Sequence, residues 1–157
     1  MVIWPWTKRN AAKKEVVRMT PEECGKYMDE KMGFVPRMFT TINQVATEPG
    51  KTFADFYASI FGDGALSHKT KELIFTACGV SWKSPRCLIH VIPAMKAGAT
   101  QGEIFEAVAV GMIAAGFVPG GPGIPYAFEY ALKVLEVAGK YSKGESWEYM
   151  QPPEFRG

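Results

Sequence analysis

The stretch "SPRCLIHVIP" at residues 84–93 places a cysteine, Cys87, three residues before a histidine, His90. Side chains three positions apart on a helix are separated by only about 60° around its axis, so both lie on the same side. An imidazole in that position can take the proton of a thiol and raise the thiolate fraction, which makes the sulfur a nucleophile. Cysteine and histidine are also common in protein interiors, so an ordinary buried pair is the alternative.

A second candidate is Glu72, which opens the apolar run "ELIFTACGV". A carboxylate at the start of a buried helix must find a partner or have its pKa raised. Glu72 is therefore a candidate for orienting the Cys87–His90 pair or relaying protons to it. The alternative is an ordinary acid in the first turn of a helix, favoured by the helix dipole and paired with Lys69 or Lys71. The residues alone support both interpretations equally.

The remaining cysteines and the second histidine are assigned no chemistry. Cys78 lies in the apolar run "FTACGV" and is expected to pack, and Cys24 follows two glutamates, which disfavour a thiolate. His68 lies among lysines and is expected to be solvated. Two histidines with scattered cysteines lack the ligand spacing of a zinc site, and "PGGPGIP" has prolines where a phosphate loop needs amide donors. We therefore expect neither a metal nor a cofactor.

Composition places the chain among single-domain globular proteins. It has 157 residues, of which 47% are hydrophobic, and a formal net charge of only +2. There is no basic face with interleaved aromatic residues, so nucleic acid is not an expected partner. The basic run "TKRNAAKKEVVR" is expected to be a solvated arm, with binding of an anionic partner as the alternative.

The sequence also predicts a cytoplasmic protein that does not cross a membrane. No apolar stretch approaches the roughly 18 residues of a membrane span, and "MVIWPWTKRN" has its apolar residues before its charges, unlike a signal peptide. Three cysteines are too few, and an odd number, for a secreted disulfide framework. Reduced thiols are therefore expected.

Helix signals recur along the whole chain. Thr20 with Glu23, and Thr100 with Glu103, have the spacing of capping boxes, and Pro93 is expected to kink the helix that contains it. The expected helical ranges are 20–33, 35–46, 50–64, 68–82, 84–99, 100–116 and 126–140. The expected fold class is all-α, a compact bundle of six or seven helices.

We expect one domain over residues 1–157 with arm-like termini at about 1–19 and 141–157. The C-terminal arm is expected either to lie on a neighbouring subunit or to be partly disordered.

From about Met32 to Ala138 the sequence resembles the alkylhydroperoxidase AhpD-like / carboxymuconolactone decarboxylase superfamily. The most specific segments are "LSHKTKELIFTACGVSW", "CLIHVIPAMKAGATQGEIFEAV" and "AAGFVPGG", after the weaker "GFVPRMF" and "EPGKTFADFYASIF". The resemblance implies a compact helical AhpD-like fold, and a homo-oligomer that is a trimer or a hexamer. Four tryptophans agree with an oligomer, because aromatic residues are favoured at interfaces: Trp4, Trp6, Trp82 and Trp147.

The resemblance also implies the site residues. In the AhpD branch a glutamate is followed by Cys-x-x-Cys, three residues and a histidine. Fifteen residues after Glu72 comes Cys87, in the place of the second cysteine, and His90 follows one residue early. The first, resolving cysteine is replaced by Ser84. The decarboxylase branch instead works with a histidine and acidic or polar groups, and "LIHVIPAMKAGAT" is close to its local pattern.

Three functions follow. The first is a thiol-dependent peroxidase or reductase with peroxiredoxin-type activity, in which Cys87 is the nucleophile, His90 its base and Glu72 a proton relay. Because Ser84 cannot form a disulfide, that enzyme needs an external thiol or redox protein. The second is a lyase in which His90 is the acid/base for a small carboxylated substrate. The third is a catalytically inactive oligomeric scaffold.

The peroxidase hypothesis makes a specific demand on Cys87. Its place near a helix start and its neighbour His90 lead us to expect the lowest pKa of the three thiols. It also predicts that Ser84→Cys creates a redox-active pair with Cys87.

Overall fold

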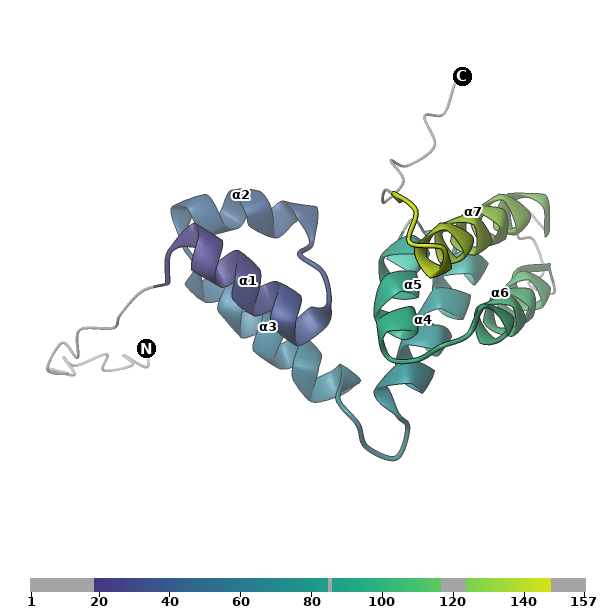
Figure 1. Cartoon of the computed structure of the whole chain (residues 1–157), viewed down its shortest axis with the longest axis horizontal. Coiled ribbons are helices and arrows are strands. Elements are labelled where there is room, and N and C mark those ends of the chain that lie inside the picture. The colour runs from purple at the N-terminus through teal and green to yellow at the C-terminus, as the bar shows by residue number, and fades with distance from the viewer. Residues whose placement is uncertain (1–18, 85, 117–123, 148–157) are drawn as a thin grey trace, which may run out of the picture.

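The computed structural model describes residues 19–84, 86–116 and 124–147. These residues form seven α-helices and no β-strand, which confirms the all-α prediction (Figure 1). In chain order the helices are α1 (Pro21–Met32), α2 (Arg37–Val45), α3 (Glu48–Phe61), α4 (His68–Ser81), α5 (Arg86–Lys96), α6 (Gln101–Gly116) and α7 (Ile124–Ser142).

The predicted capping boxes explain where two of the helices begin. The Thr20 and Thr100 hydroxyls accept hydrogen bonds from the backbone N–H groups of Glu23 and Glu103, at 3.2 and 3.1 Å. Each glutamate accepts one in return from the backbone of its threonine, at 2.8 Å in both cases. Both exchanges satisfy amide groups that a helix start leaves without partners.

The helices form two groups, α1–α3 and α4–α7, joined through residues 62–67 (Figure 1). The core of the first group contains Cys24, Met28, Met32, Phe34, Phe39, Ala54 and Tyr57. The core of the second group is built around α5 and includes Val80, Cys87, Leu88, Val91, Ile104, Val108 and Val134. Ile89 of α5 packs on the first core, so the two groups meet along α5.

A close approach of backbones fixes α4 against α5. A Cβ atom added to Gly79 would lie 2.5 Å from the Cβ of Cys87, closer than real Cβ contacts come. Glycine at this position therefore lets the two helices pack with little space between them. Pro93 lies inside α5, as predicted, and Gly33 of the α1–α2 loop is adjacent to it. Gly33 has φ of 80°, a conformation that favours glycine.

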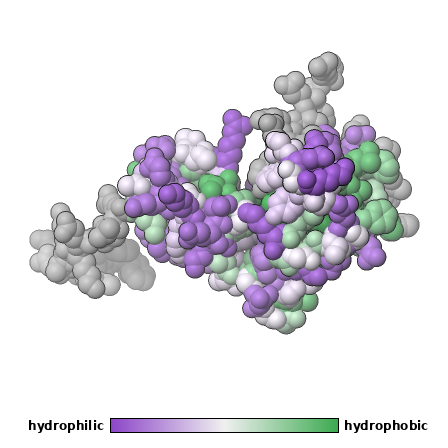
Figure 2. Space-filling model, in the orientation of Figure 1, coloured by the Kyte–Doolittle hydropathy of each residue, from purple (hydrophilic) through white to green (hydrophobic). Residues whose placement is uncertain are grey.

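Some sequence features lie outside the described residues. These are the basic N-terminal run, Trp4 and Trp6, the proline-rich loop at 117–123, and the chain from residue 148 onward. Among the described helices, none combines the length and apolarity needed to cross a membrane. Figure 2 shows hydrophobic side chains on the outer face of the α4–α7 group, and the exposed ones include Phe105, Ile113, Phe128 and Leu132.

Candidate active site at the junction of the two helix groups

Glu72 lies at the junction of α3, α4 and α5, and its side chain is fully buried. Its Oε1 accepts a hydrogen bond from the Tyr57 hydroxyl at 2.7 Å, and its Oε2 lies 2.6 Å from Nδ1 of His90. The three side chains come from three different helices. The carboxylate thus has two hydrogen-bonding partners, as a buried acid requires.

The alternative in which Glu72 is an ordinary first-turn acid is wrong, because its neighbouring lysines are engaged elsewhere. Lys69 Nζ lies 2.7 Å from Glu103 on α6. Lys71 Nζ donates to the carbonyl oxygens of Ile60 and Gly62, beyond the end of α3. Glu72 therefore belongs to a buried cluster and not to the helix surface.

Aromatic rings surround His90, which is only 4% exposed. Its ring is stacked on Phe75 with centroids 3.7 Å apart and, less closely, on Phe61 at 5.6 Å. Tyr57 is also roughly parallel at 6.1 Å, and Phe34 stands edge-on at 5.5 Å. The imidazole is therefore enclosed by aromatic side chains, with the Glu72 carboxylate against its Nδ1.

The hydrogen bonds described for His90 all involve Nδ1. Besides Glu72, the Tyr57 hydroxyl lies 3.4 Å from the same nitrogen. With the Glu72 carboxylate oxygen as acceptor, Nδ1 of His90 is the donor in this hydrogen bond. A carboxylate on one ring nitrogen fixes the orientation of the imidazole and leaves Nε2 for proton exchange with another molecule.

His68 lies closer to this cluster than the sequence indicated. Its Nε2 is 3.8 Å from Oε1 of Glu72, one helical turn away, and its side chain is only 34% exposed. Nδ1 lies 2.9 Å from the Phe61 carbonyl oxygen, and the backbone N–H donates to Asp63 at 2.8 Å. The expected solvated histidine is thus partly buried, with one edge facing the carboxylate.

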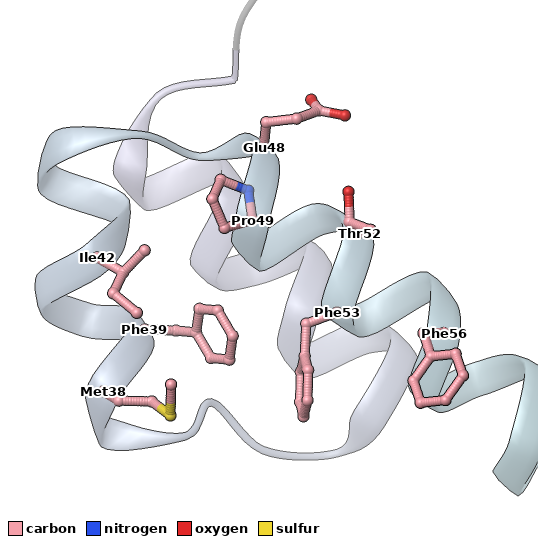
Figure 3. A pocket seen from close by; sticks show the side chains of 8 residues that line it. All are labelled: Met38, Phe39, Ile42, Glu48, Pro49, Thr52, Phe53 and Phe56. Carbon is pink, nitrogen blue, oxygen red and sulfur yellow. The ribbon is translucent and has the colours of Figure 1, made fainter. Parts of the chain in front are cut away.

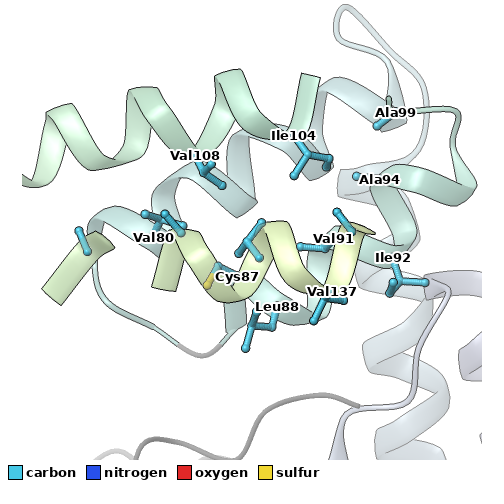
Figure 4. Close-up of a cluster of buried hydrophobic side chains, with 14 of the residues drawn as sticks. Val80, Cys87, Leu88, Val91, Ile92, Ala94, Ala99, Ile104, Val108 and Val137 are labelled. Carbon is cyan, nitrogen blue, oxygen red and sulfur yellow. The ribbon is translucent and has the colours of Figure 1, made fainter. Parts of the chain in front are cut away.

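Cys87 is not part of the cluster around Glu72. Its side chain is fully buried in the second apolar core, near Val80, Leu88 and Val108 (Figure 4). Burial raises the pKa of the Cys87 thiol from 9.0 to about 12, and the backbone N–H groups nearby offset only part of this effect. Burial therefore acts against the expectation that Cys87 has the lowest pKa of the three thiols. Desolvation raises the pKa of this thiol by more than the helix dipole and the imidazole of His90 lower it.

Ser84 and the other two cysteines lie outside the cluster around Glu72 in the contacts described for them. Ser84 precedes α5: its carbonyl accepts from the backbone of Cys87 at 3.1 Å and its hydroxyl from the backbone of Arg86 at 3.4 Å. Cys24 is buried and donates to the Thr47 carbonyl at 3.3 Å. Cys24, Cys78 and Cys87 are all free thiols. The function of Ser84 as a resolving position remains a prediction.

Two grooves lie away from Glu72 and His90. One, of about 680 Å³, lies between α2 and α3 and is lined mainly by apolar residues, with Glu48 and Thr52 among them (Figure 3). The other, of about 310 Å³, lies between α4 and α6. Within residues 19–84, 86–116 and 124–147, no three histidine, cysteine, aspartate or glutamate side chains lie close enough together to hold a metal ion.

Tyr57 and the aromatic rings are the functional elements that sequence reasoning missed. Tyr57 follows Phe53 and Phe56 at helical spacing, which is typical of a core-facing stripe. The hydroxyl of Tyr57 is the feature of the sequence that could have indicated its role, because a buried tyrosine O–H requires a hydrogen-bonding partner. The sequence does not indicate that this partner is Glu72 of the next helix.

Comparison with known proteins identifies a family for most of the helical part of the chain. A model of the carboxymuconolactone decarboxylase family matches residues 48–133, from the start of α3 into α7. This range contains Tyr57, Glu72 and His90. Searches of curated proteins and of solved structures returned no match. Since the family model covers more than half of the 157 residues, the chain belongs to the carboxymuconolactone decarboxylase family.

Proposed function

We propose that the protein is a lyase that removes a carboxyl group from a small carboxylated substrate, with His90 as the general acid. The observation that carries this proposal is the buried pair of Glu72 and His90, 2.6 Å apart. It supports an imidazolium whose Nδ1 is held in place and whose Nε2 carries a transferable proton. This arrangement is what acid/base catalysis by histidine requires.

The proposed step breaks the carbon–carbon bond to the substrate carboxylate. Carbon dioxide leaves, and the electron pair of that bond moves into a carbonyl group conjugated with the same carbon. Nε2–H of His90 then protonates the carbon. The Glu72 carboxylate stabilises the imidazolium before transfer, and Tyr57 holds that carboxylate in place. The substrate class is therefore a small acid or lactone acid with a conjugated carbonyl.

Access to Nε2 is the structural demand of this proposal. His90 is 4% exposed and Phe34 of the α1–α2 loop is 6% exposed and edge-on to its ring. A substrate can reach the imidazole only if this loop moves. Phe34 lies on the α1–α3 side of the junction, so a small separation of the two groups exposes the ring.

Thiol chemistry at Cys87 has less support. A thiol with its pKa raised to about 12 is almost entirely protonated near neutral pH, and protonated sulfur is a poor nucleophile. The external thiol or redox protein expected as a partner is needed only for that peroxidase mechanism.

The test compares both activities in the same variants. Purified protein is assayed for release of carbon dioxide from carboxymuconolactone and related lactone acids, and for reduction of an organic hydroperoxide with a dithiol. We expect His90→Gln to lower kcat/KM for decarboxylation at least about 100-fold. Cys87→Ala, checked by thermal unfolding, should keep decarboxylase activity within about threefold of the native protein.

The opposite pattern would favour the peroxidase. Hydroperoxide reduction that disappears in Cys87→Ala, together with no decarboxylation of any lactone acid, contradicts the lyase proposal. If neither activity is present while all variants fold, the oligomeric scaffold is the remaining hypothesis.

We also propose that the protein is a homo-oligomer, a trimer or a hexamer. Large exposed side chains on α6 and α7, including Phe105, Ile113 and Phe128, support an interface between copies. Light scattering at micromolar concentration tests this, and a monomer mass contradicts it. A cytoplasmic location remains a prediction from the cysteine count.

A further inference from the structure

The groove between α2 and α3 lies outside the candidate active site (Figure 3). Met38, Phe53 and Phe56 line it and are 60%, 38% and 63% exposed. Its volume of about 680 Å³ falls within the range of about 300–1,000 Å³ that ligand sites occupy. A concave apolar surface of this kind is typical of a binding site, because water solvates it poorly.

The chain enters the described structure beside this groove. The carbonyl oxygen of Met19, the first described residue, accepts a hydrogen bond from the Thr47 hydroxyl at 3.2 Å. The Thr47 carbonyl in turn accepts from the Cys24 thiol, which fixes the first turn of α1 at the same point. Glu48, the next residue, lines the groove. Residues 1–18 therefore join the structure at one end of the groove.

The composition of residues 1–18 complements the groove. The first six residues, "MVIWPW", are all apolar and include Trp4 and Trp6. Tryptophan buries a large apolar area and is enriched in binding surfaces. The following segment is basic, with Lys8, Arg9, Lys13, Lys14 and Arg18. Glu48 is the acidic residue of the groove and forms no ion pair within the described part of the chain.

The connecting length permits docking within one chain. Residues 7–18 form a twelve-residue linker, and such a linker spans about 20 Å on average when it is flexible. Glu48 and Phe56 are eight residues apart on α3, which corresponds to about 12 Å along the helix. The first six residues can therefore reach any part of the groove from the same chain.

We propose that residues 1–6 dock in the α2–α3 groove of their own chain, with Trp4 and Trp6 against Phe53 and Phe56. The basic residues that follow pair with Glu48. The docked segment covers exposed apolar surface on α3, the helix that also carries Tyr57 next to Phe56. This inference concerns a different surface from the proposed lyase site and holds whatever reaction the protein catalyses.

The test is photo-crosslinking in the full chain. p-Benzoylphenylalanine replaces Phe56, and the irradiated protein is digested with trypsin and analysed by mass spectrometry. We expect the main crosslink to join position 56 to the tryptic peptide of residues 1–8. Before digestion, the crosslinked product should have the mass of one chain.

Replacing Val45 with p-benzoylphenylalanine is the matched control. Val45 lies at the end of α2, is 90% exposed and does not line the groove. Its yield of this crosslink should be at least tenfold lower.

Two variants make the result specific. Trp4→Ser with Trp6→Ser should reduce the crosslink from position 56 at least tenfold, whereas Trp82→Ser, which removes a 73% exposed tryptophan elsewhere, should not change it. A crosslink to residues 1–8 of a second chain, seen as a product of two-chain mass, overturns docking within one chain. Crosslinks from position 56 to other peptides, or none at all, overturn the proposal entirely.

Discussion

The two faces of α5 show how one helix can carry two opposite chemical environments. His90 faces the junction of the helix groups, where Glu72 and Tyr57 bind its Nδ1 and aromatic rings cover it. Cys87, three residues earlier, faces the apolar core of the second group. Helix periodicity separates the two positions by only about 60°. In a helix that is buried on both sides, that angle is enough to separate a charged cluster from a dry core.

The comparison also shows why the same burial has opposite consequences at the two positions. Glu72 and His90 are both buried, but each provides the other with a hydrogen-bonding partner at 2.6 Å. Cys87 lies in an apolar core, so burial favours its neutral form, and nearby backbone amides offset only part of this effect. The partner, and not the depth of burial, decides whether a group is suited to chemistry.

The largest expected effect is the protection of Cys87 from alkylation. With its pKa raised from 9.0 to about 12, its thiolate fraction at pH 8 is about 1,000-fold lower than that of an ordinary thiol. We expect iodoacetamide to label Cys78, which is partly exposed, and to leave Cys87 unmodified until the protein unfolds. Site mapping by mass spectrometry over time measures both rates. Faster labelling of Cys87 than of Cys78 in the folded protein would restore Cys87 as the nucleophile.

The raised pKa of Cys87 also predicts how stability depends on pH. Above pH 9 the unfolded chain loses the Cys87 proton while the folded chain keeps it up to about pH 12. The unfolded state then binds fewer protons, so the free energy of unfolding falls with rising pH, by about 1.4 kcal/mol per unit from this group. The native protein should therefore lose more stability between pH 9 and 11 than Cys87→Ala does, in urea unfolding. If the free energy of unfolding falls equally with pH in the two proteins, the raised pKa of Cys87 is contradicted.

The next prediction concerns the carboxylate of the candidate cluster formed by Glu72, His90 and Tyr57. Glu72→Gln keeps a hydrogen-bonding side chain at the junction but removes the negative charge that stabilises the His90 imidazolium. We expect the proposed decarboxylation to lose about 100-fold in kcat/KM, with the fold retained by circular dichroism. Glu22→Gln, an exposed change on α1, is the control and should keep the native rate. An unchanged rate in Glu72→Gln would remove Glu72 from the mechanism.

The helices were predictable from the sequence because their signals are local. Thr20 with Glu23 and Thr100 with Glu103 form the hydrogen bonds that their spacing predicts. Gly33 ends α1 in the conformation that favours glycine. Each of these signals depends on residues within a few positions of one another, so no knowledge of tertiary packing was needed.

The candidate site was predictable only in part. Glu72 and His90 were found because a charged or polar residue inside an apolar run is unusual whatever surrounds it. Tyr57 was missed and Cys87 misjudged because their environments depend on which helices pack together. α3 brings the Tyr57 hydroxyl to Glu72, and α6 and α7 enclose the Cys87 thiol. Neither contact is encoded in the spacing of nearby residues.

The fourth prediction tests the packing on the Cys87 side of α5. Gly79→Ala places a methyl group against the Cys87 Cβ and backbone, at 2.5 to 2.9 Å. We expect a loss of about 1–3 kcal/mol in the free energy of unfolding, because α4 and α5 must move apart. Urea unfolding measures this loss.

Gly25→Ala is the matched control for that change. Gly25 is also inside a helix, but nothing lies within 4 Å of the position where its Cβ would be. Alanine there should stabilise the protein by about 0.5–1 kcal/mol. If both variants unfold alike, the close approach of α4 and α5 is not present in solution.

The smallest expected effect tests the other face of α5 through Tyr57. Tyr57→Phe removes the hydroxyl that donates to Glu72 at 2.7 Å and keeps the ring, which stacks on Phe61 with centroids 4.1 Å apart. A typical intramolecular hydrogen bond contributes about 0.5–1.5 kcal/mol, so the free energy of unfolding should fall by about that amount. Decarboxylation should slow only a few-fold, because His90 still fixes the carboxylate on its other oxygen. Tyr27→Phe is the control: its hydroxyl donates to Asp55 on the surface of the first group, where such bonds contribute little, so no measurable loss of stability is expected. If the two variants lose the same stability, then Tyr57 does not hold Glu72, and the junction is a simpler two-residue site of glutamate and histidine.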